Sequence, residues 1–298
     1  QLAAKGDTDI RSLSLSNSGL LAAGDSLNIR NQNNLSNSGE INAARLDVVS
    51  GSLNNSGRIS QTGSQSLNMD AGKVDNLNGG LIGYTVAAAS GSGTASNAGN
   101  HGQTGNNNSG SSAHSGNGTS TTTGGSTTAT PVTPPTLADG QISVSGSLSN
   151  DKGQITANGQ TNLNARNGLG NQDSTLNLGH LSVRGNETRN NSGRINAAQA
   201  DISTQALNNQ QGRINITDSL SVQSAQVHNQ GGQVLVGHQA DIHTGILDNR
   251  QAGVVAAGKA LTIHAQTLDN QQGRLAGSGK LSLAAMALDN REGAIDGA

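Results

Sequence analysis

The chain has 298 residues but no cysteine, phenylalanine or tryptophan, and its single tyrosine is Tyr84. The absence of cysteine excludes a disulfide framework, a thiolate metal site and a cysteine nucleophile. A compact core normally depends on aromatic side chains for large buried area, and this chain offers only Leu, Ile, Val and Ala for that purpose. We therefore expect either disorder or a thin, repetitive core of small aliphatic residues.

Charge and long apolar runs are also scarce. Charged residues make up 12% of the chain and hydrophobic residues 32%, and the formal net charge is −2. This charge gives no electrostatic reason to expect nucleic acid or an anionic membrane surface as a partner. No run is long and apolar enough to cross a bilayer. The first residue is Gln and no signal-peptide pattern follows it, so we expect a segment of a longer protein whose export signal lies elsewhere.

The residues that are present recur with a period near 20. The recurring element is an Asn two positions after an aliphatic residue, as in residues 268–270 and 288–290, both Leu-Asp-Asn. A Val replaces the Leu in two units, and Arg189 stands in that place before Asn191. Successive spacings are 20, 18, 21, 74, 21, 20, 18, 20, 20, 21 and 20. We predict that these residues form one structural column: Asn17, Asn37, Asn55, Asn76, Asn150, Asn171, Asn191, Asn209, Asn229, Asn249, Asn270 and Asn290.

Each repeat also contains two further strand-like pieces. One reads Gly-x-Ile-x-Ala, as in residues 193–197, and the other reads Leu-x-Ile-x-Ala, as in residues 261–265. Aliphatic residues alternate with polar ones in both, which is typical of strands with one buried face. No segment has the periodicity of a helical repeat, and each strand has too few leucines for a leucine-rich repeat. Three short strands and three corners per repeat predict an all-β, right-handed parallel β-helix, a solenoid of about 20 residues per coil.

Stacking of such coils explains the repeated Asn. Strands in consecutive coils lie about 4.8 Å apart, so twelve coils would form a rod roughly 55 Å long. Equivalent residues then form a column, in which identical Asn side chains can hydrogen-bond to the coils above and below. Asn also tolerates the left-handed backbone of a corner. In each Leu-Asp-Asn we expect the Leu to fill the core, the Asn to turn the corner and the Asp to face solvent.

The one irregular interval, from Asn76 to Asn150, contains a low-complexity stretch rich in Gly, Ser, Thr and Asn at residues 85–139. Taking this stretch out of the interval leaves a spacing equal to one coil. We therefore predict β-helix coils over residues 1–84, an insertion over 85–139, and coils of the same rod over 140–298. The insertion should leave the rod at the corner between the Gly-x-Ile-x-Ala strand, the first strand of the coil, and the Leu-x-Ile-x-Ala strand, the second. The composition of the insertion predicts disorder. A ligand-contacting or glycan-bearing loop is the alternative.

Two sets of residues could in principle carry chemistry, and each fits a structural interpretation better. His243 and His264 each follow an inward Ile, so they should stack on one outer face, where two imidazoles could bind a metal. We interpret them as a solvent-exposed polar column. Clustered carboxylates could indicate polysaccharide cleavage, but Asp269 and Asp289 share one repeat position, and the aromatic platforms of sugar sites are missing. The full acidic set is Asp241, Asp248, Asp269, Asp289 and Asp296.

Four arginines that follow the repeat Gly should line one face of the rod. We expect them to be solvated rather than to bind an anionic partner, and they are Arg58, Arg194, Arg213 and Arg274. The sequence therefore predicts no enzyme, no catalytic residue, no metal ligand and no cofactor.

The repeat unit L-D-N-x-x-G-x-I-x-A-x-x-x-L-x-I-x-A resembles the haemagglutinin repeats of filamentous haemagglutinin and of the related contact-dependent inhibition exoproteins. Residues 268–298 carry the resemblance most clearly, residues 247–256 nearly as well, and in all it covers 1–84 and 140–298. The insertion, and the absence of a Gly in the turn after Asn171, depart from the pattern. These departures concern local coil geometry.

The resemblance implies a right-handed parallel β-helix in a large bacterial adhesin exported by two-partner secretion, found outside the cell or on its surface. It implies three partners: neighbouring coils of a longer chain, an outer-membrane secretion partner and a host or target-cell receptor. The function implied is a structural shaft that presents binding or toxin domains away from the cell. Two alternatives stay open, a receptor-binding segment within the same rod and a β-helix enzyme that degrades polysaccharide.

Overall fold

The computed structural model describes residues 1–64, 67–84, 140–157 and 161–297. In these ranges the chain consists of β-strands and turns, and it contains no helix, hence none that could span a membrane. The insertion predicted at 85–139 lies outside the described residues. The described coils belong to one compact unit.

The strands are short where they end at a corner and long where the chain bends without a break in pairing. In chain order they are β1 (Leu2–Ala4), β2 (Thr8–Asn17), β3 (Leu20–Asn37), β4 (Glu40–Asn55), β5 (Arg58–Gln61), β6 (Asn68–Asn76), β7 (Leu81–Tyr84), β8 (Gln141–Val144), β9 (Leu148–Ser149), β10 (Gln154–Thr156), β11 (Asn162–Ala165), β12 (Leu169–Gly170), β13 (Thr175–Arg189), β14 (Arg194–Asn208), β15 (Arg213–His228), β16 (Gln233–Val236), β17 (Gln239–Asp248), β18 (Val254–Ala257), β19 (Ala260–Asp269), β20 (Arg274–Gly277), β21 (Lys280–Asp289) and β22 (Ala294–Gly297).

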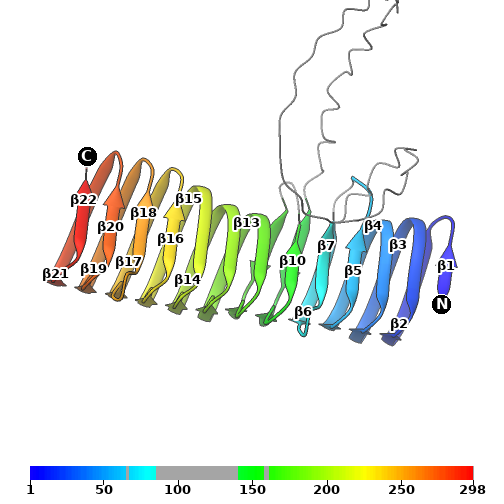
Figure 1. The fold of residues 1–298 in the computed structure, drawn as a ribbon. Coiled ribbons are helices and arrows are strands. Elements are labelled where there is room, and N and C mark those ends of the chain that lie inside the picture. The colour runs from blue at the N-terminus through cyan, green and yellow to red at the C-terminus, as the bar shows by residue number, and fades with distance from the viewer. Residues whose placement is uncertain (65–66, 85–139, 158–160, 298) are drawn as a thin grey trace, which may run out of the picture. The chain divides into compact units, whose positions relative to one another are not determined.

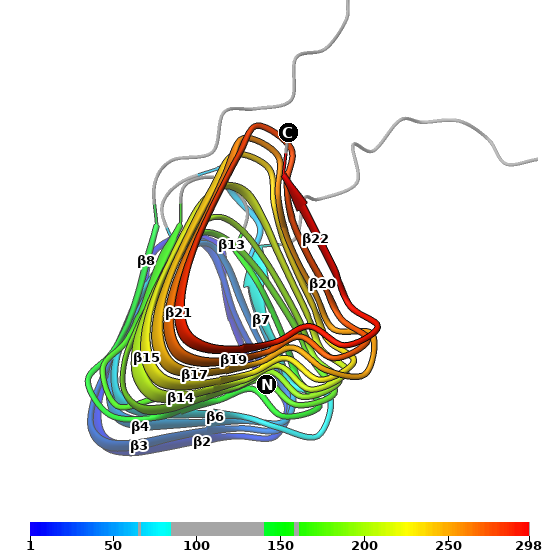
Figure 2. The ribbon, with the colours of Figure 1, turned by 90° about the vertical axis from the view of Figure 1, so that its left-hand side faces the viewer.

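Consecutive coils lie side by side and pair in parallel (Figure 1). Strand β13 pairs with β14 from Thr175 opposite Arg194 to Arg189 opposite Asn208, so each residue faces its equivalent in the next repeat. Strand β19 pairs with β21 in the same way. Figure 2, which looks along the stack, shows each coil as a triangle with three sides and three corners. The prediction of an all-β parallel solenoid with one sequence repeat per coil is confirmed.

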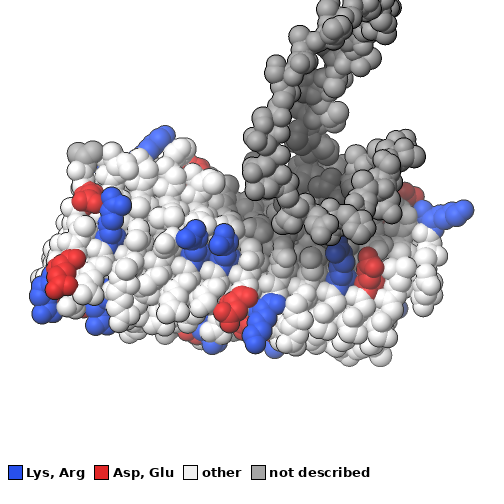
Figure 3. Space-filling view, in the orientation of Figure 1, with Lys and Arg blue, Asp and Glu red and all other residues white. Residues whose placement is uncertain are grey.

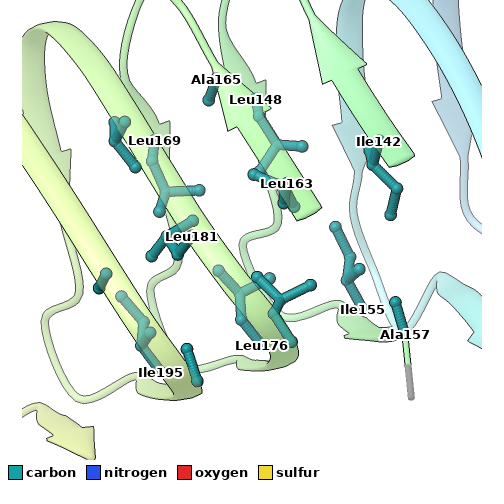
Figure 4. Packing of buried hydrophobic residues seen from close by; sticks show 14 of the residues in the cluster. Ile142, Leu148, Ile155, Ala157, Leu163, Ala165, Leu169, Leu176, Leu181 and Ile195 are labelled. Atoms are coloured by element: carbon teal, nitrogen blue, oxygen red, sulfur yellow. The ribbon is translucent and has the colours of Figure 1, made fainter. Parts of the chain in front are cut away.

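The core is a set of aliphatic columns, one for each inward position of the coil (Figure 4). Ile155, Leu176 and Ile195 follow one another along the first side of the triangle, which the Gly-x-Ile-x-Ala segments form, and each is fully buried. Leu163 and Leu181 do the same along the second side. Burying such a side chain contributes about 1.5–3 kcal/mol. A stack of aliphatic residues thus replaces the aromatic core that the composition rules out.

The coils on the two sides of the insertion pair directly with each other. Strand β6, before the insertion, pairs in register with β8, after it, and Val74 lies opposite Leu148. Strand β7 pairs with β10 of the following coil. The described chain leaves the solenoid after Tyr84, at the end of the first side, and returns at Gly140, before the second side. The coils on either side of the insertion therefore stack directly, with a shift of one residue between the pairing of β6 with β8 and its pairing with β9.

From Asn76 onwards, the corner after the column Asn contains a left-handed residue, and a Gly follows it in all but one coil. In each of these coils a residue two or three positions after the Asn has a positive φ, for example 55° at Gln211 and 59° at Gln272. The departure after Asn171 leaves this turn in place, because Asp173 has a φ of 50°. Ser174 stands where the Gly is missing, and its hydroxyl donates a hydrogen bond to Asn171 Oδ1 at 2.8 Å.

Candidate functional site

The most extensive polar feature is a buried column of Asn side chains at one corner of the triangle. Asn209 Nδ2 donates to Asn229 Oδ1 at 2.7 Å, and Asn229 Nδ2 donates to Asn249 Oδ1 at 2.7 Å. Each amide also donates to backbone carbonyls, as Asn229 does to Val254 O at 3.0 Å. All of these side-chain bonds point toward the C-terminus. The complete column is Asn17, Asn37, Asn55, Asn76, Asn150, Asn171, Asn190, Asn209, Asn229, Asn249, Asn270 and Asn290.

The prediction was wrong at one position, since Asn190 and not Asn191 belongs to the column. Asn190 is fully buried, whereas Asn191 is partly exposed and only its Oδ1 is engaged, accepting from Gln210 N at 3.1 Å. The error arose because Thr188, not Arg189, occupies the place of the repeat Leu. The aliphatic-x-Asn pattern therefore does not identify the column Asn of a coil in which Thr replaces the aliphatic residue.

Thr188 also leaves a buried hydroxyl without a partner. It lies between Leu169 and Leu207 in neighbouring coils, is fully buried, and its Oγ1 accepts and donates no hydrogen bond within the described residues. Desolvating a hydroxyl without compensation costs about 1–3 kcal/mol.

The Thr188→Val change should therefore raise the free energy of unfolding by about 1 kcal/mol, because Val has nearly the same shape and carries no polar atom. Urea unfolding followed by circular dichroism measures it. The matched control is Thr204→Val, where the hydroxyl donates to Ala206 O at 3.1 Å and its loss should destabilise. If Thr188→Val instead destabilises the fold, the Thr188 hydroxyl has a hydrogen-bond partner in solution.

A second ladder, of aspartates, runs beside the Asn column. Asp248, Asp269 and Asp289 lie opposite one another in successive coils, as predicted for two of them. The expectation that this Asp faces solvent was wrong for Asp248, which is 8% exposed. Arg250 folds back onto it, with Nε at 2.9 Å from Oδ1 and Nη2 at 2.9 Å from Oδ2. The Asp-x-Arg spacing was the signal available in the sequence.

These contacts change the titration of Asp248. Burial raises the pKa of its carboxyl, but hydrogen bonds from the side chain and backbone of Arg250 and the positive charge of Arg250 outweigh burial, so the pKa lies below its usual value. A depressed pKa in the folded state stabilises the fold above the unfolded value, near about 3.9, and this contribution is lost as the pH falls through the folded pKa.

Asp248→Asn should thus be destabilising at neutral pH, and the gap between it and the wild type should narrow as the pH is lowered below about 4. Unfolding free energies from urea titrations between about pH 7 and pH 3 measure this gap. A gap that stays constant over the whole range would mean that the Asp248 carboxylate contributes nothing specific to the fold.

The predicted stacking of two histidines is confirmed. The rings of His243 and His264 are nearly parallel, 11° apart, with centroids separated by 4.7 Å. Asp241 Oδ1 lies 3.0 Å from His243 Nε2. No group of three or more His, Asp or Glu side chains is arranged to hold a metal in the described ranges.

Another His–Asp pair forms on neighbouring coils. His238 Nδ1 lies 2.8 Å from Asp218 Oδ1, and Gln199 Nε2 donates to Asp218 Oδ2 at 3.0 Å. The hydrogen bond from Gln199, followed by that of His238, lowers the pKa of Asp218. The carboxylate is thus held by two different coils.

The remaining charges are spread over the surface. Arg194 lies opposite Arg213 in the next coil, as predicted, and Arg274 pairs with Asp296 at 2.8 Å. Figure 3 shows the charged side chains of one face as pairs and small groups, with uncharged surface between the groups. Because Asp241 pairs with His243 and Asp296 pairs with Arg274, the predicted acidic set does not converge on one point.

A comparison with protein families places repeats along the chain. The family model described as the haemagglutinin repeat matches residues 1–78, 136–200, 190–250 and 235–298. No curated protein and no solved structure matches the chain. The family segments cover nearly all of the described coils.

Proposed function

The chain belongs to the haemagglutinin-repeat family, and from this premise we propose that it is a structural shaft segment of a large secreted or surface-attached bacterial adhesin or contact-dependent inhibition filament. The shaft holds binding or toxin domains away from the cell. Its length and rigidity carry this role, and no catalytic step is involved. We propose an outer-membrane secretion partner during export, a location outside the cell or on its surface, and a receptor on a host or target cell for the domains that the shaft presents.

One observation carries the proposal: the Asn column and the aliphatic columns continue from coil to coil through the described residues, even across the insertion, although bulges shift the strand register between some coils. Asn76 Nδ2 donates to Asn150 Oδ1 at 2.7 Å, although the whole insertion separates them in the chain. A structure that keeps its stacking across such an interruption is suited to bearing load along its axis. Parallel solenoids are stabilised by nearest-neighbour contacts, so length is added coil by coil.

The second candidate is a receptor-binding segment within the same rod, with the insertion as its contact surface. Residues 85–139 do not follow the sequence repeat, which favours this candidate over binding by the coils themselves.

Binding of the purified chain to host and bacterial target cells, with and without residues 85–139, distinguishes the two. If the chain is a shaft, it should show no saturable binding either with or without residues 85–139. Saturable binding that disappears when residues 85–139 are removed would replace the shaft with the receptor-binding segment. Binding that survives their removal would place the contact on the coils. The melting temperature of both forms controls for the fold.

A further inference from the structure

The third side of the triangle, which the Leu-x-Asn segments form, has very short strands at β9 and β12. Each of these strands has two residues, and β12 pairs with β9 and with β13 over two residues only. In later coils the pairing continues around the preceding corner, and β14 pairs with β15 from Thr204 opposite Ser224 to Asn208 opposite His228. The ladder that joins consecutive coils is therefore weak on this side at β9 and β12.

The corner that leads into this side also lacks a hydrogen bond that later coils have. In the coils of β14, β15 and β17, a Ser or Thr at this corner donates to the backbone carbonyl two residues farther on, as Thr204 does to Ala206 O at 3.1 Å. Gly185 lies opposite Thr204 and has a φ of 116°. Gly168, directly before β12, has a φ of 100°. Glycine supplies no hydroxyl, and its backbone gains more freedom on opening than that of any other residue.

The aliphatic column behind this side is interrupted at the same place. Leu148 and Leu169 lie in the column (Figure 4), but Thr188 follows them, and its Oγ1 has no hydrogen-bond partner in the described part of the chain. On the outer surface, an open hollow of about 330 Å³ is lined by residues of the same segments, among them Ser147 and Gly170. Short pairing, glycine corners, a polar core residue and small outer side chains thus coincide on one side of adjoining coils.

The other two sides of these coils are closed. On the first side, β10 pairs with β13, and Ile155 lies opposite Leu176 in the core. On the second side, β11 pairs with β13 over four residues, and Leu163 and Leu181 are fully buried. If the third side opens, two ladders still join the two halves of the rod, so the rod bends at this point and does not break.

We propose that the third side at residues 147–150, 168–171 and 185–190 is a built-in joint, which opens locally before the rest of the rod and lets the rod bend there. Local opening has its lowest free energy where backbone pairing is short and few apolar contacts are lost. The corner glycines lower this free energy further. The joint is a property of the coils, and it does not depend on the shaft function.

Native-state hydrogen exchange of the full chain, read residue by residue, tests the proposal. Asn171 and Asn229 provide matched amides, because the backbone N–H of each donates to a carbonyl of the next coil at 2.7 Å. After correction for intrinsic rates, the Asn171 amide should exchange about tenfold or more faster than the Asn229 amide. Amides of residues 180–183, on the second side of the same coils, should stay protected.

Two variants separate the joint from general stability. Thr188→Leu restores the aliphatic column and should slow exchange at Asn171 by about tenfold. Val227→Leu enlarges the residue at the same position of a regular coil, and it should leave exchange at Asn171 unchanged.

Three results would overturn the proposal. The first is equal exchange at Asn171 and Asn229 in the wild type, a comparison that needs no variant to fold. The second is an unchanged rate at Asn171 in a folded Thr188→Leu chain. The third is fast exchange centred on residues 141–144, because the neighbouring insertion and not the joint would then be its origin.

Discussion

Replacing Asn190 with Ala is expected to lower the free energy of unfolding by about 3 kcal/mol, whereas the same change at its neighbour Asn191 should cost less than about 0.5 kcal/mol. The two residues have the same type and adjacent positions. Only Asn190 lies in the buried column.

The large destabilisation expected for Asn190→Ala follows from the polar groups that would lose their hydrogen-bond partners. Asn190 Oδ1 accepts from Asn171 Nδ2 at 2.7 Å. Asn190 Nδ2 donates to Asn209 Oδ1 at 2.7 Å, to Arg213 O at 3.1 Å and to Gly193 O at 3.3 Å. Ala removes all four bonds, and the partner atoms lose them at a buried corner. Each stranded polar group costs about 1–3 kcal/mol. Asn191 makes its single side-chain bond at the surface, where water can replace the lost oxygen.

Urea unfolding of the two variants, followed by circular dichroism, measures the contrast. Hydrogen exchange locates the destabilised region, because amides in the coils next to Asn190 should lose protection first. Equal effects of the two substitutions would contradict the column as an energetic element, and a larger effect at Asn191 would restore the column that the sequence alone predicted.

A second large effect is expected at the corner glycines. Gly232→Ala should cost about 3 kcal/mol or more, because the new Cβ would lie 2.0 Å from Asn209 O and 2.6 Å from Asn229 Oδ1. Both obstructing atoms belong to column residues, so relief of the clash must disturb the column or separate two coils. Gly231→Ala should cost only about 1 kcal/mol, the strain of a φ of 63° in a residue with a Cβ.

The neighbour is a suitable control because other coils already accept side chains in its place. Gln211 and Gln251, at the equivalent turns, have φ values of 55° and 57°. A Cβ at Gly231 would have no atom closer than 3.6 Å. Thermal unfolding of both variants tests the pair. If Gly232→Ala melts at the wild-type temperature, the coils are not packed as closely at this corner as the structure has them.

The sequence predicted the fold because one physical rule repeats in every coil. Alternating aliphatic residues define three buried strands, and an Asn that recurs once per coil defines the axis of stacking. The pairing of β6 with β8 fits the same rule, because the sequence between them is that of one coil once residues 85–139 are taken out.

The details that the sequence could not supply depend on single side chains. The Thr at position 188 concealed the true register of one unit, so Asn191 was chosen in place of Asn190. The burial of Asp248 depends on the fold-back of Arg250, which periodicity does not reveal. A repeat pattern predicts the features that all coils share, but it does not predict the positions at which a single coil differs.

The claim that this chain is a shaft is tested most directly by its length as a function of coil number. Deleting residues 210–249 removes two whole coils and joins Asn209 to Arg250 at the same point of the repeat. Small-angle X-ray scattering should then show a fold of unchanged cross-section whose maximum dimension is shorter by about 10 Å, two spacings of about 4.8 Å. Deleting residues 210–239, one and a half coils, breaks the register and should abolish cooperative unfolding. A two-coil deletion that unfolds the chain, or that leaves its maximum dimension unchanged, would contradict the account.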